Sequence, residues 1–243
     1  MARRILPIGI QTFRNLRESN CCYVDKTGYA LRLAEEGKHY FLSRPRRFGK
    51  SLFADTLKEL FEGTRELFEG LEAFGRWDRS VRHPVLRLDF SGGDFKLPGY
   101  LETSLMAQLG QAERRLGVDP IHDSGPERFA YLLETLHQQT GQRVAVLVDE
   151  YDKPIVDALK EPAVAKANQD YLRGLYAMIK ACDADVRFCF LTGVTKFSKA
   201  RLFSGLNNLR DLTLNPAYSS ICGYTENDLD TVFAPELPSL DCE

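Results

Sequence analysis

The segment of this chain best suited to chemistry is the eight-residue run Arg44-Pro45-Arg46-Arg47-Phe48-Gly49-Lys50-Ser51. It ends in Gly-Lys-Ser, follows a short apolar run and precedes an amphipathic one. In the phosphate-binding loop pattern GxxxxGK[ST], backbone N–H groups surround the phosphates, the lysine reaches the β- and γ-phosphates, and the hydroxyl holds Mg²⁺. We therefore expect Lys50 to contact phosphate and Ser51 to contact the metal. The expected nucleotide-binding residues are Pro45, Arg46, Arg47, Phe48, Gly49, Lys50, Ser51 and Leu52.

One position departs from the pattern, because Arg44 stands where the first glycine belongs and Pro45 restricts the loop further. The tripeptide Gly-Lys-Ser is common by chance, and a polar helix start with a glycine is the alternative interpretation. The motif becomes specific only when it follows a strand and opens a helix, and the flanking residues predict both.

A second set of chemical groups lies at Asp149-Glu150, directly after the apolar run Val144–Val148. In a Walker B strand the Asp supports Mg²⁺ beside the phosphate loop, and an adjacent Glu polarises the attacking water. We expect Asp149 to be a metal ligand and Glu150 a catalytic residue. The alternative is an acidic loop that caps the following helix.

A third polar group, Thr192, ends the apolar run Arg187–Thr192. A strand between the phosphate-loop strand and the Walker B strand can bring its polar tip to the water or the γ-phosphate, and Thr192 fits that catalytic role. A threonine at a strand end is common, so a purely structural role stays open.

These groups need strands and helices to position them, and the pattern of apolar residues alternates between the two. We expect residues 5–26 to form an irregular segment that ends in a strand-like Cys22–Asp25. Helices are expected at 27–36, 50–62, 99–116, 127–139 and 163–181, with strands at 39–43, 85–90, 144–148 and 187–192. Residues 203–214 are predicted to be a loop. Thr225–Asp228 forms a capping box, so a helix starts there, and Pro235 and Pro238 end it.

Composition places the chain among ordinary soluble proteins, with 243 residues, 44% hydrophobic and 27% charged. The net charge of −2 gives little support to nucleic-acid binding. The six cysteines form no CxxC pair and the four histidines are scattered, so no zinc site is predicted. No apolar run approaches the length of a membrane-spanning helix, and no signal peptide is recognisable. We expect a cytoplasmic protein with reduced thiols.

Several further residues have two interpretations. One or two of the loop arginines could face phosphate, whereas any single one is more often solvated. Asp152 and Lys153 could orient Glu150 or reach a neighbouring subunit, but a cap on the helix near Pro154 is favoured. A charge sensor or an arginine finger across a subunit interface could be any one of four residues, and the sequence does not distinguish between them: Lys196, Lys199, Arg201 and Arg210. Tyr23 and Phe13 could stack on adenine, with core packing favoured for both, and Asp89 is interpreted as a loop cap.

The segments PRRFGKS, VLVDEYDKPI, LTGVTKFSKARLFSGLNNL and YVDKT together resemble the prokaryotic AAA-ATPase-like domain family, over nearly the whole chain. The family's phosphate loop is similar in having an Arg-rich approach in place of the first glycine. The resemblance implies an ATP-binding domain of the AAA type with Lys50 and Ser51 on phosphates and Mg²⁺ and with Asp149 and Glu150 in Walker B. Longer members of the family continue into a helical region and a C-terminal domain similar to PD-(D/E)XK nucleases, which these residues do not contain.

Together these observations predict a three-layer α/β P-loop NTPase fold with a mostly parallel sheet, of strand order 5-1-4-3-2 by analogy. Residues 1–223 would form the P-loop domain, and residues 224–243 the beginning of a truncated helical lid. The expected function is ATP binding with slow Mg²⁺-dependent hydrolysis that drives or gates an effector. Alternatives are a non-hydrolysing nucleotide switch, a P-loop kinase for a small molecule, and a nucleic-acid module. A homo-oligomer is an open expectation, because AAA-type sites often lie between subunits.

Overall fold

The computed structural model describes residues 4–78, 80–195 and 209–235, and its centre is a five-stranded parallel sheet of order β2-β3-β4-β1-β5. The strands are β1 (His39–Ser43), β2 (Val85–Asp89), β3 (Val144–Asp149), β4 (Val186–Gly193) and β5 (Arg210–Asp211). Counted from the other edge, this is the predicted order 5-1-4-3-2. The α/β fold with a parallel sheet is thereby confirmed.

The register of the strands brings their carboxyl ends to one edge of the sheet. Ser43 of β1 is paired with Gly193 of β4, and Asp89 of β2 is paired with Asp149 of β3. In open α/β sheets, ligands bind outside this edge. The phosphate loop, the Asp149-Glu150 pair and Thr192 therefore all emerge on the same side.

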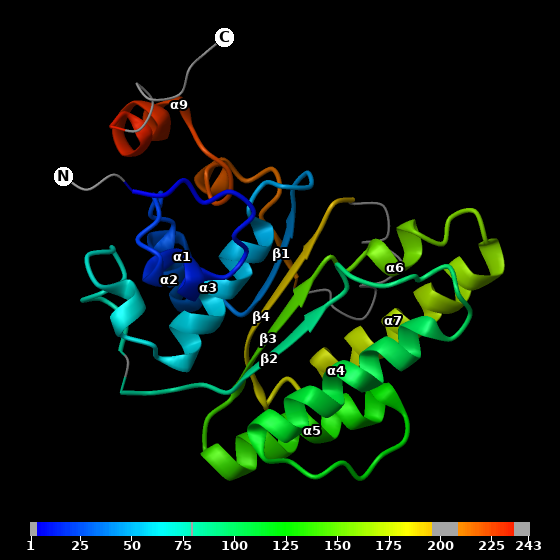
Figure 1. Ribbon diagram of the computed structural model, residues 1–243. Coiled ribbons are helices and arrows are strands. Elements are labelled where there is room, and N and C mark those ends of the chain that lie inside the picture. The colour runs from blue at the N-terminus through cyan, green and yellow to red at the C-terminus, as the bar shows by residue number, and fades with distance from the viewer. Residues whose placement is uncertain (1–3, 79, 196–208, 236–243) are drawn as a thin grey trace.

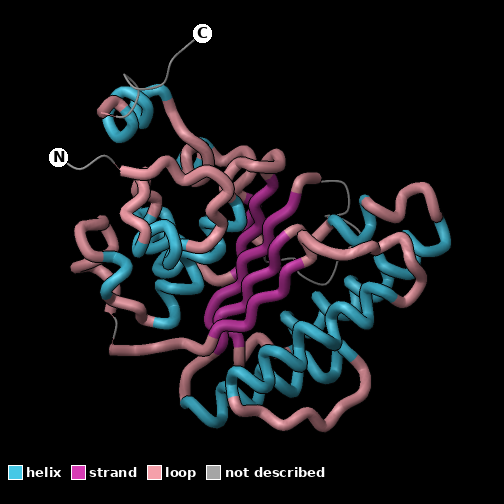
Figure 2. The backbone as a smooth tube through the Cα atoms, viewed as in Figure 1, coloured by secondary structure: helices cyan, strands magenta, loops and turns pink. Residues whose placement is uncertain are grey.

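Helices cover both faces of the sheet (Figures 1 and 2). One face carries α1 (Phe13–Glu18), α2 (Thr27–Glu36) and α3 (Lys50–Glu62). The other carries α4 (Tyr100–Leu116), α5 (Gly125–Thr140) and α7 (Pro162–Ala181). Every residue of β1 and β3 is buried, as expected for strands covered on both faces. This layering forms two apolar cores, one on each side of the sheet.

The segment near the C-terminal end packs against residues near the N-terminal end. A short helix, α9 (Glu226–Asp228), begins with the predicted capping box between Thr225 and Asp228, and a π-helical turn follows at Leu229–Phe233. Phe233 packs with Cys22 and Val24. Lys26 forms an ion pair with Asp228, with 3.4 Å between Nζ and Oδ2. Figure 1 shows α9 beside the N-terminal segment.

The smaller elements are the helix α6 (Lys153–Val156) and the 3₁₀ turns at Glu66–Phe68 and Pro216–Tyr218. Two expectations were wrong. The segment before α2 contains the helix α1, and Cys22–Asp25 is not a strand, because Cys21 forms only an isolated bridge with Ile5. Within the predicted loop 203–214, the two residues of β5 pair with β1.

The long helices and buried strands lie within about two residues of their predicted bounds. Lys196, Lys199, Arg201, Asn207, Asn208 and Pro238 lie outside the described residues. Within the part of the chain that the structure describes, no helix is both long and apolar enough to cross a bilayer. The described cysteines Cys21, Cys22, Cys182, Cys189 and Cys222 are free thiols.

Candidate functional site

The phosphate loop connects the end of β1 to the start of α3, in the strand–loop–helix context that the motif requires. Gly49 precedes the helix with φ +86°, in the left-handed region that glycine adopts without strain. Arg47 also has a positive φ, +67°, which is uncommon for a residue with a Cβ. Strained backbone of this kind gathers at ligand-binding loops, so the loop conformation agrees with the predicted site.

Arg44, which replaces the first glycine of the motif, ties the loop to the rest of the protein. Its guanidinium donates to the carbonyl oxygens of Ser43 (3.1 Å), Thr213 (2.7 Å) and Tyr218 (3.2 Å). Its backbone N–H donates to the carbonyl of Gly193 at 3.2 Å. Arg44 thus anchors the start of the loop, and the guanidinium is committed to backbone carbonyls.

The Lys50 ammonium is buried and finds an acceptor for each of its three donors. Nζ lies 3.1 Å from the carbonyl oxygen of Arg44, 3.2 Å from that of Pro45 and 3.1 Å from Oε1 of Glu150. Lys50 is only 4% exposed. Two motifs far apart in sequence are therefore joined by one ion pair.

Asp149 and Glu150 occupy the end of β3 and share a contact with Thr192. The Thr192 hydroxyl donates to Oδ1 of Asp149, and the backbone N–H of Glu150 donates to the same hydroxyl at 3.4 Å. Glu150 has φ +53°, so the chain turns sharply directly after the strand. Thr192 is fully buried, and its hydroxyl contacts both acidic residues.

The second oxygen of Asp149, Oδ2, is buried and has no hydrogen-bond partner among the described residues. The nearest positive group is Arg87 of β2, whose Nη2 lies 3.6 Å away. Arg87 also pairs with Asp55 of α3 at 2.9 Å. An orphaned carboxylate oxygen at the carboxyl edge of a sheet is the type of ligand that Mg²⁺ prefers. The side chains present therefore fit a metal at Asp149.

Asp152 does not act as the helix cap that its position predicts, and this interpretation is corrected. Its side chain makes no cap hydrogen bond to α6 and instead accepts from the backbone N–H and hydroxyl of Thr195, at 2.7 and 2.6 Å. The Tyr151 hydroxyl donates to the carbonyl of Thr195 at 2.9 Å. A Cβ on Gly193 would meet the Tyr151 ring at 2.3 Å. The residues after β3 and those after β4 therefore form one packed unit.

A cavity of about 1030 Å³ opens over the phosphate loop. Seven of the eight predicted nucleotide-binding residues line it, namely Arg46, Arg47, Phe48, Gly49, Lys50, Ser51 and Leu52. Ser91 and Glu150 also line it, whereas Arg44, Pro45, Asp149 and Thr192 do not. Residues 7–11 and 221–224, from segments far apart in the sequence, also line the cavity. The volume is that of a site for a small molecule or cofactor.

Both positive and apolar side chains line the cavity. Lys26 and Lys153 add to the positive charge of Arg46 and Arg47, as an anionic ligand requires. Tyr23, Ile8, Leu52, Ile221 and Tyr224 supply apolar surface. Burial raises the pKa of the Cys222 thiol to about 12, so this group faces the cavity as a neutral thiol.

The structure shows where four further candidate residues lie. Tyr23 lines the cavity, whereas Phe13 is fully buried in a core. Arg210 pairs with Tyr40 near the amino end of β1, whereas the phosphate loop follows the carboxyl end of this strand. Its Nη1 lies 3.5 Å from Oε2 of Glu36. Asp89 accepts a hydrogen bond from the backbone N–H of Ser91 and is the expected loop cap. Sequence reasoning missed Lys26 and Arg87, which no local motif marks.

A parallel sheet of this order, with a phosphate loop on β1 and an Asp-Glu pair ending β3, defines a P-loop NTPase-like fold. The chain belongs to the AAA-ATPase-like family, described as predicted AAA-ATPase, whose profile matches residues 7–203. The suspected family is thus confirmed. Membership supports nucleotide binding and a role of the ATPase class.

A curated relative from Azotobacter chroococcum mcd 1, described as "Uncharacterized protein in vnfD 5'region", is 56% identical over 242 residues. The match covers 99% of this chain and 47% of the relative, so the chain spans about half the length of the relative that it matches. No solved structure matches the chain.

Proposed function

We propose that this protein binds ATP with Mg²⁺ and hydrolyses it slowly, and that the nucleotide cycle drives or gates an effector. The observation that carries the proposal is the contact of Lys50 with Glu150 in the cavity wall, next in sequence to the buried Asp149. These are the groups that phosphoryl transfer to water needs, at the sheet edge where such ligands bind.

Ser51 and Asp149 would hold Mg²⁺. The metal, when bound, neutralises negative charge on the β- and γ-phosphate oxygens. The fit is supported by the unpartnered Oδ2 of Asp149 and by the position of Ser51 in the cavity wall. Thr192 acts as a positioning residue, since its hydroxyl fixes both Oδ1 of Asp149 and the backbone of Glu150.

Hydrolysis requires a water molecule to attack the γ-phosphorus as the bond to the ADP oxygen breaks. Glu150 orients this water and accepts its proton. Lys50 contacts the phosphates and stabilises the charge that develops on them, and Arg46 and Arg47 supply further positive charge at the cavity wall. The apolar surface around Tyr23 and Ile221 is suited to the nucleobase.

The three donors of Lys50 are satisfied by the carbonyl oxygens of Arg44 and Pro45 and by Glu150. ATP binding must exchange these contacts for phosphate oxygens. The same exchange releases Glu150, so nucleotide binding and activation of the catalytic base are coupled.

A second candidate, the non-hydrolysing switch, is favoured by the same ion pair. In this candidate, ATP binding breaks the ion pair between Lys50 and Glu150, and Glu150 then changes the conformation of the protein without activating a water molecule. Single-turnover release of inorganic phosphate separates the two candidates. Release that is abolished in Glu150→Gln supports hydrolysis, and equal release in the variant and the parent contradicts it.

We further propose that residues 224–243 begin a helical lid over the nucleotide. The capping box at Thr225, the ion pair of Lys26 with Asp228 and the place of Tyr224 in the cavity wall support this. We also propose that the P-loop domain ends at residue 223 and the lid begins at residue 224. The same proposal includes a homo-oligomer, a cytoplasmic location and, in longer relatives, a C-terminal nuclease-like domain.

A further inference from the structure

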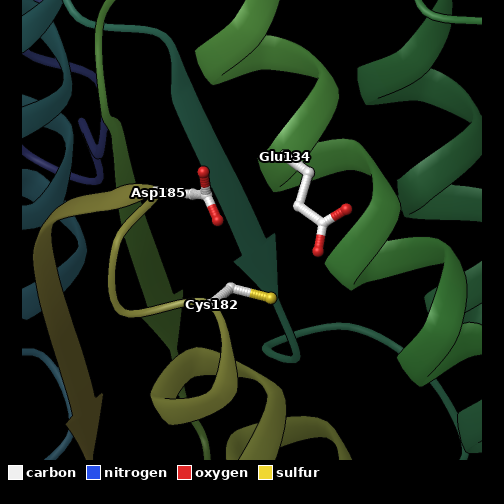
Figure 3. A group of neighbouring side chains, drawn as sticks. All are labelled: Glu134, Cys182 and Asp185. Atoms are coloured by element: carbon white, nitrogen blue, oxygen red, sulfur yellow. The ribbon is translucent and has the colours of Figure 1, made fainter.

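A second group of chemically reactive side chains lies at the opposite edge of the sheet. Glu134 of α5 faces Cys182 and Asp185, which belong to the turn between α7 and β4 (Figure 3). One ligand atom from each of the three side chains lies within 4.8 Å of the others. Figure 3 shows the sulfur and both carboxylates directed toward a common space.

The group is built from two short sequence pairs that only the tertiary structure unites. Glu134 and His137 are three residues apart on α5, and Cys182 and Asp185 are three residues apart in the turn. Nδ1 of His137 lies 2.8 Å from Oδ1 of Asp185. A histidine that contacts a ligating carboxylate in this way fixes its orientation and is a common feature of metal sites.

The thiol of Cys182 is the observation that distinguishes this group from an ordinary acidic patch. The residue is 95% buried, and its sulfur has no hydrogen-bond partner in the part of the chain that the structure describes. Burial, Glu134 and Asp185 together raise the pKa of the thiol to about 11. The charged groups that act on this buried thiol are therefore two acidic side chains, an arrangement that favours a bound cation.

The backbone holds Cys182 and Asp185 in place, whereas Glu134 can adjust. The N–H of Asp185 donates to the carbonyl of Cys182 at 2.9 Å, and the N–H of Val144 donates to the carbonyl of Asp185 at 2.7 Å. Glu134 is exposed on α5, so its side chain can rotate toward the pair. Metal–ligand bonds of about 2.0–2.3 Å require tetrahedral ligand atoms to lie roughly 3.5 Å apart, which a small rotation achieves.

We propose that Glu134, Cys182 and Asp185 bind a divalent transition-metal ion of the zinc class, with His137 as the residue that orients Asp185. Sulfur and carboxylate ligands together suit Zn²⁺ and its spectroscopic substitute Co²⁺, and they do not suit Mg²⁺, which prefers oxygen. Binding exchanges the S–H proton, which passes to the solvent, for a metal–sulfur bond. The ion would join α5 to the start of β4 and so stabilise the fold.

This site is independent of the proposed nucleotide site. Cys182 and Asp185 lie at the amino end of β4, whereas Thr192 and the phosphate loop lie at the carboxyl ends of β4 and β1. Failure of one proposal therefore does not touch the other.

The test is a titration of the full chain, freed of metal with a chelator and kept reduced, with Co²⁺ in the absence of nucleotide. A thiolate-to-cobalt charge-transfer band is expected, and Zn²⁺ should displace it. Cys182→Ser should remove the band, whereas the control Cys21→Ser, which changes another buried thiol, should retain it.

Asp185→Asn and Glu134→Gln test the carboxylates without altering the thiol, and Glu127→Gln is the matched control on the same helix. Loss of a ligand should weaken Co²⁺ binding by at least about tenfold. Zn²⁺ should also raise the melting temperature of the parent but not of Cys182→Ser. The absence of a charge-transfer band in the folded parent, or a band that survives in Cys182→Ser, overturns the proposal.

Discussion

The Nζ atom of Lys50 lies 3.1 Å from Oε1 of Glu150, and both side chains are largely withdrawn from solvent. The contact joins the phosphate loop to the residue that follows the buried strand β3. On the proposed function, a bound nucleotide would compete with Glu150 for the Lys50 ammonium. This contact brings two motifs that are far apart in the sequence into one candidate site.

Replacement of Glu150 by glutamine tests that coupling. Glu150→Gln removes the anionic partner of Lys50, so we expect ATP affinity to be equal to or higher than that of the parent, with hydrolysis lost. The control Glu161→Gln changes an acidic residue at the start of α7, outside the cavity. Isothermal titration and phosphate release are the measurements, and a large loss of ATP affinity in Glu150→Gln would speak against the coupling.

Arg87 gives a prediction about metal binding at Asp149. Arg87 is the positive group nearest to the orphaned Oδ2, so Arg87→Met leaves Asp149 and Asp55 without their partner. We expect a loss of stability of about 3 kcal/mol in the free protein, because a buried charge is left unpaired. Mg²⁺ with ATP should raise the melting temperature of the variant more than that of the parent. Equal shifts in the two proteins would exclude Asp149 as the metal ligand.

We expect substitutions of Arg44 and Arg46 to affect different properties, the first the free energy of unfolding and the second the affinity for ATP. Arg44→Ala removes three hydrogen bonds to backbone carbonyls, so we expect a fall of about 1–3 kcal/mol in the free energy of unfolding. Arg46 is exposed and lines the cavity, so Arg46→Ala should weaken ATP binding and leave stability within about 0.5 kcal/mol of the parent. Urea unfolding and ATP titration of both variants are the measurements, and the reverse pattern would reject this division of roles.

Two glycines form a matched test of the packed unit after β3 and β4. Gly193→Ala places a Cβ against the Tyr151 ring and Asp152, so we expect a loss of about 1–3 kcal/mol of stability. Gly174 lies within α7 with open space around it, and Gly174→Ala should raise stability by about 0.5–1 kcal/mol. Urea unfolding decides, and a Gly193→Ala protein as stable as the parent would show that the close packing is not required.

Much of the fold could be predicted because its buried strands and amphipathic helices are regular. The run Val144–Val148 and the helix of residues 50–62 carry strong local patterns, and the structure places both as expected. The helix α1 was missed because only Phe13 and Leu16 of its six residues are buried, which leaves too short a pattern to recognise.

The loop residues of the candidate site could be predicted for a similar reason, since the motif is contiguous. Lys26, Arg87 and the role of Asp152 could not, because each depends on contacts with distant residues. Asp152 has the sequence of a helix cap, yet the residues after β4 offer it stronger donors. The group of Glu134, Cys182 and Asp185 could not be predicted for the same reason, because its members lie on separate elements.

The most direct test of the central claim is titration of the full chain with a fluorescent ATP analogue, with and without Mg²⁺, beside Lys50→Ala. The control is Lys58→Ala, which removes a lysine from the same helix. Lys58 forms ion pairs with Glu59 and Glu62. The account predicts Mg²⁺-strengthened binding in the parent and in Lys58→Ala, and its loss in a folded Lys50→Ala. Unchanged affinity in Lys50→Ala would contradict the assignment of the phosphate loop.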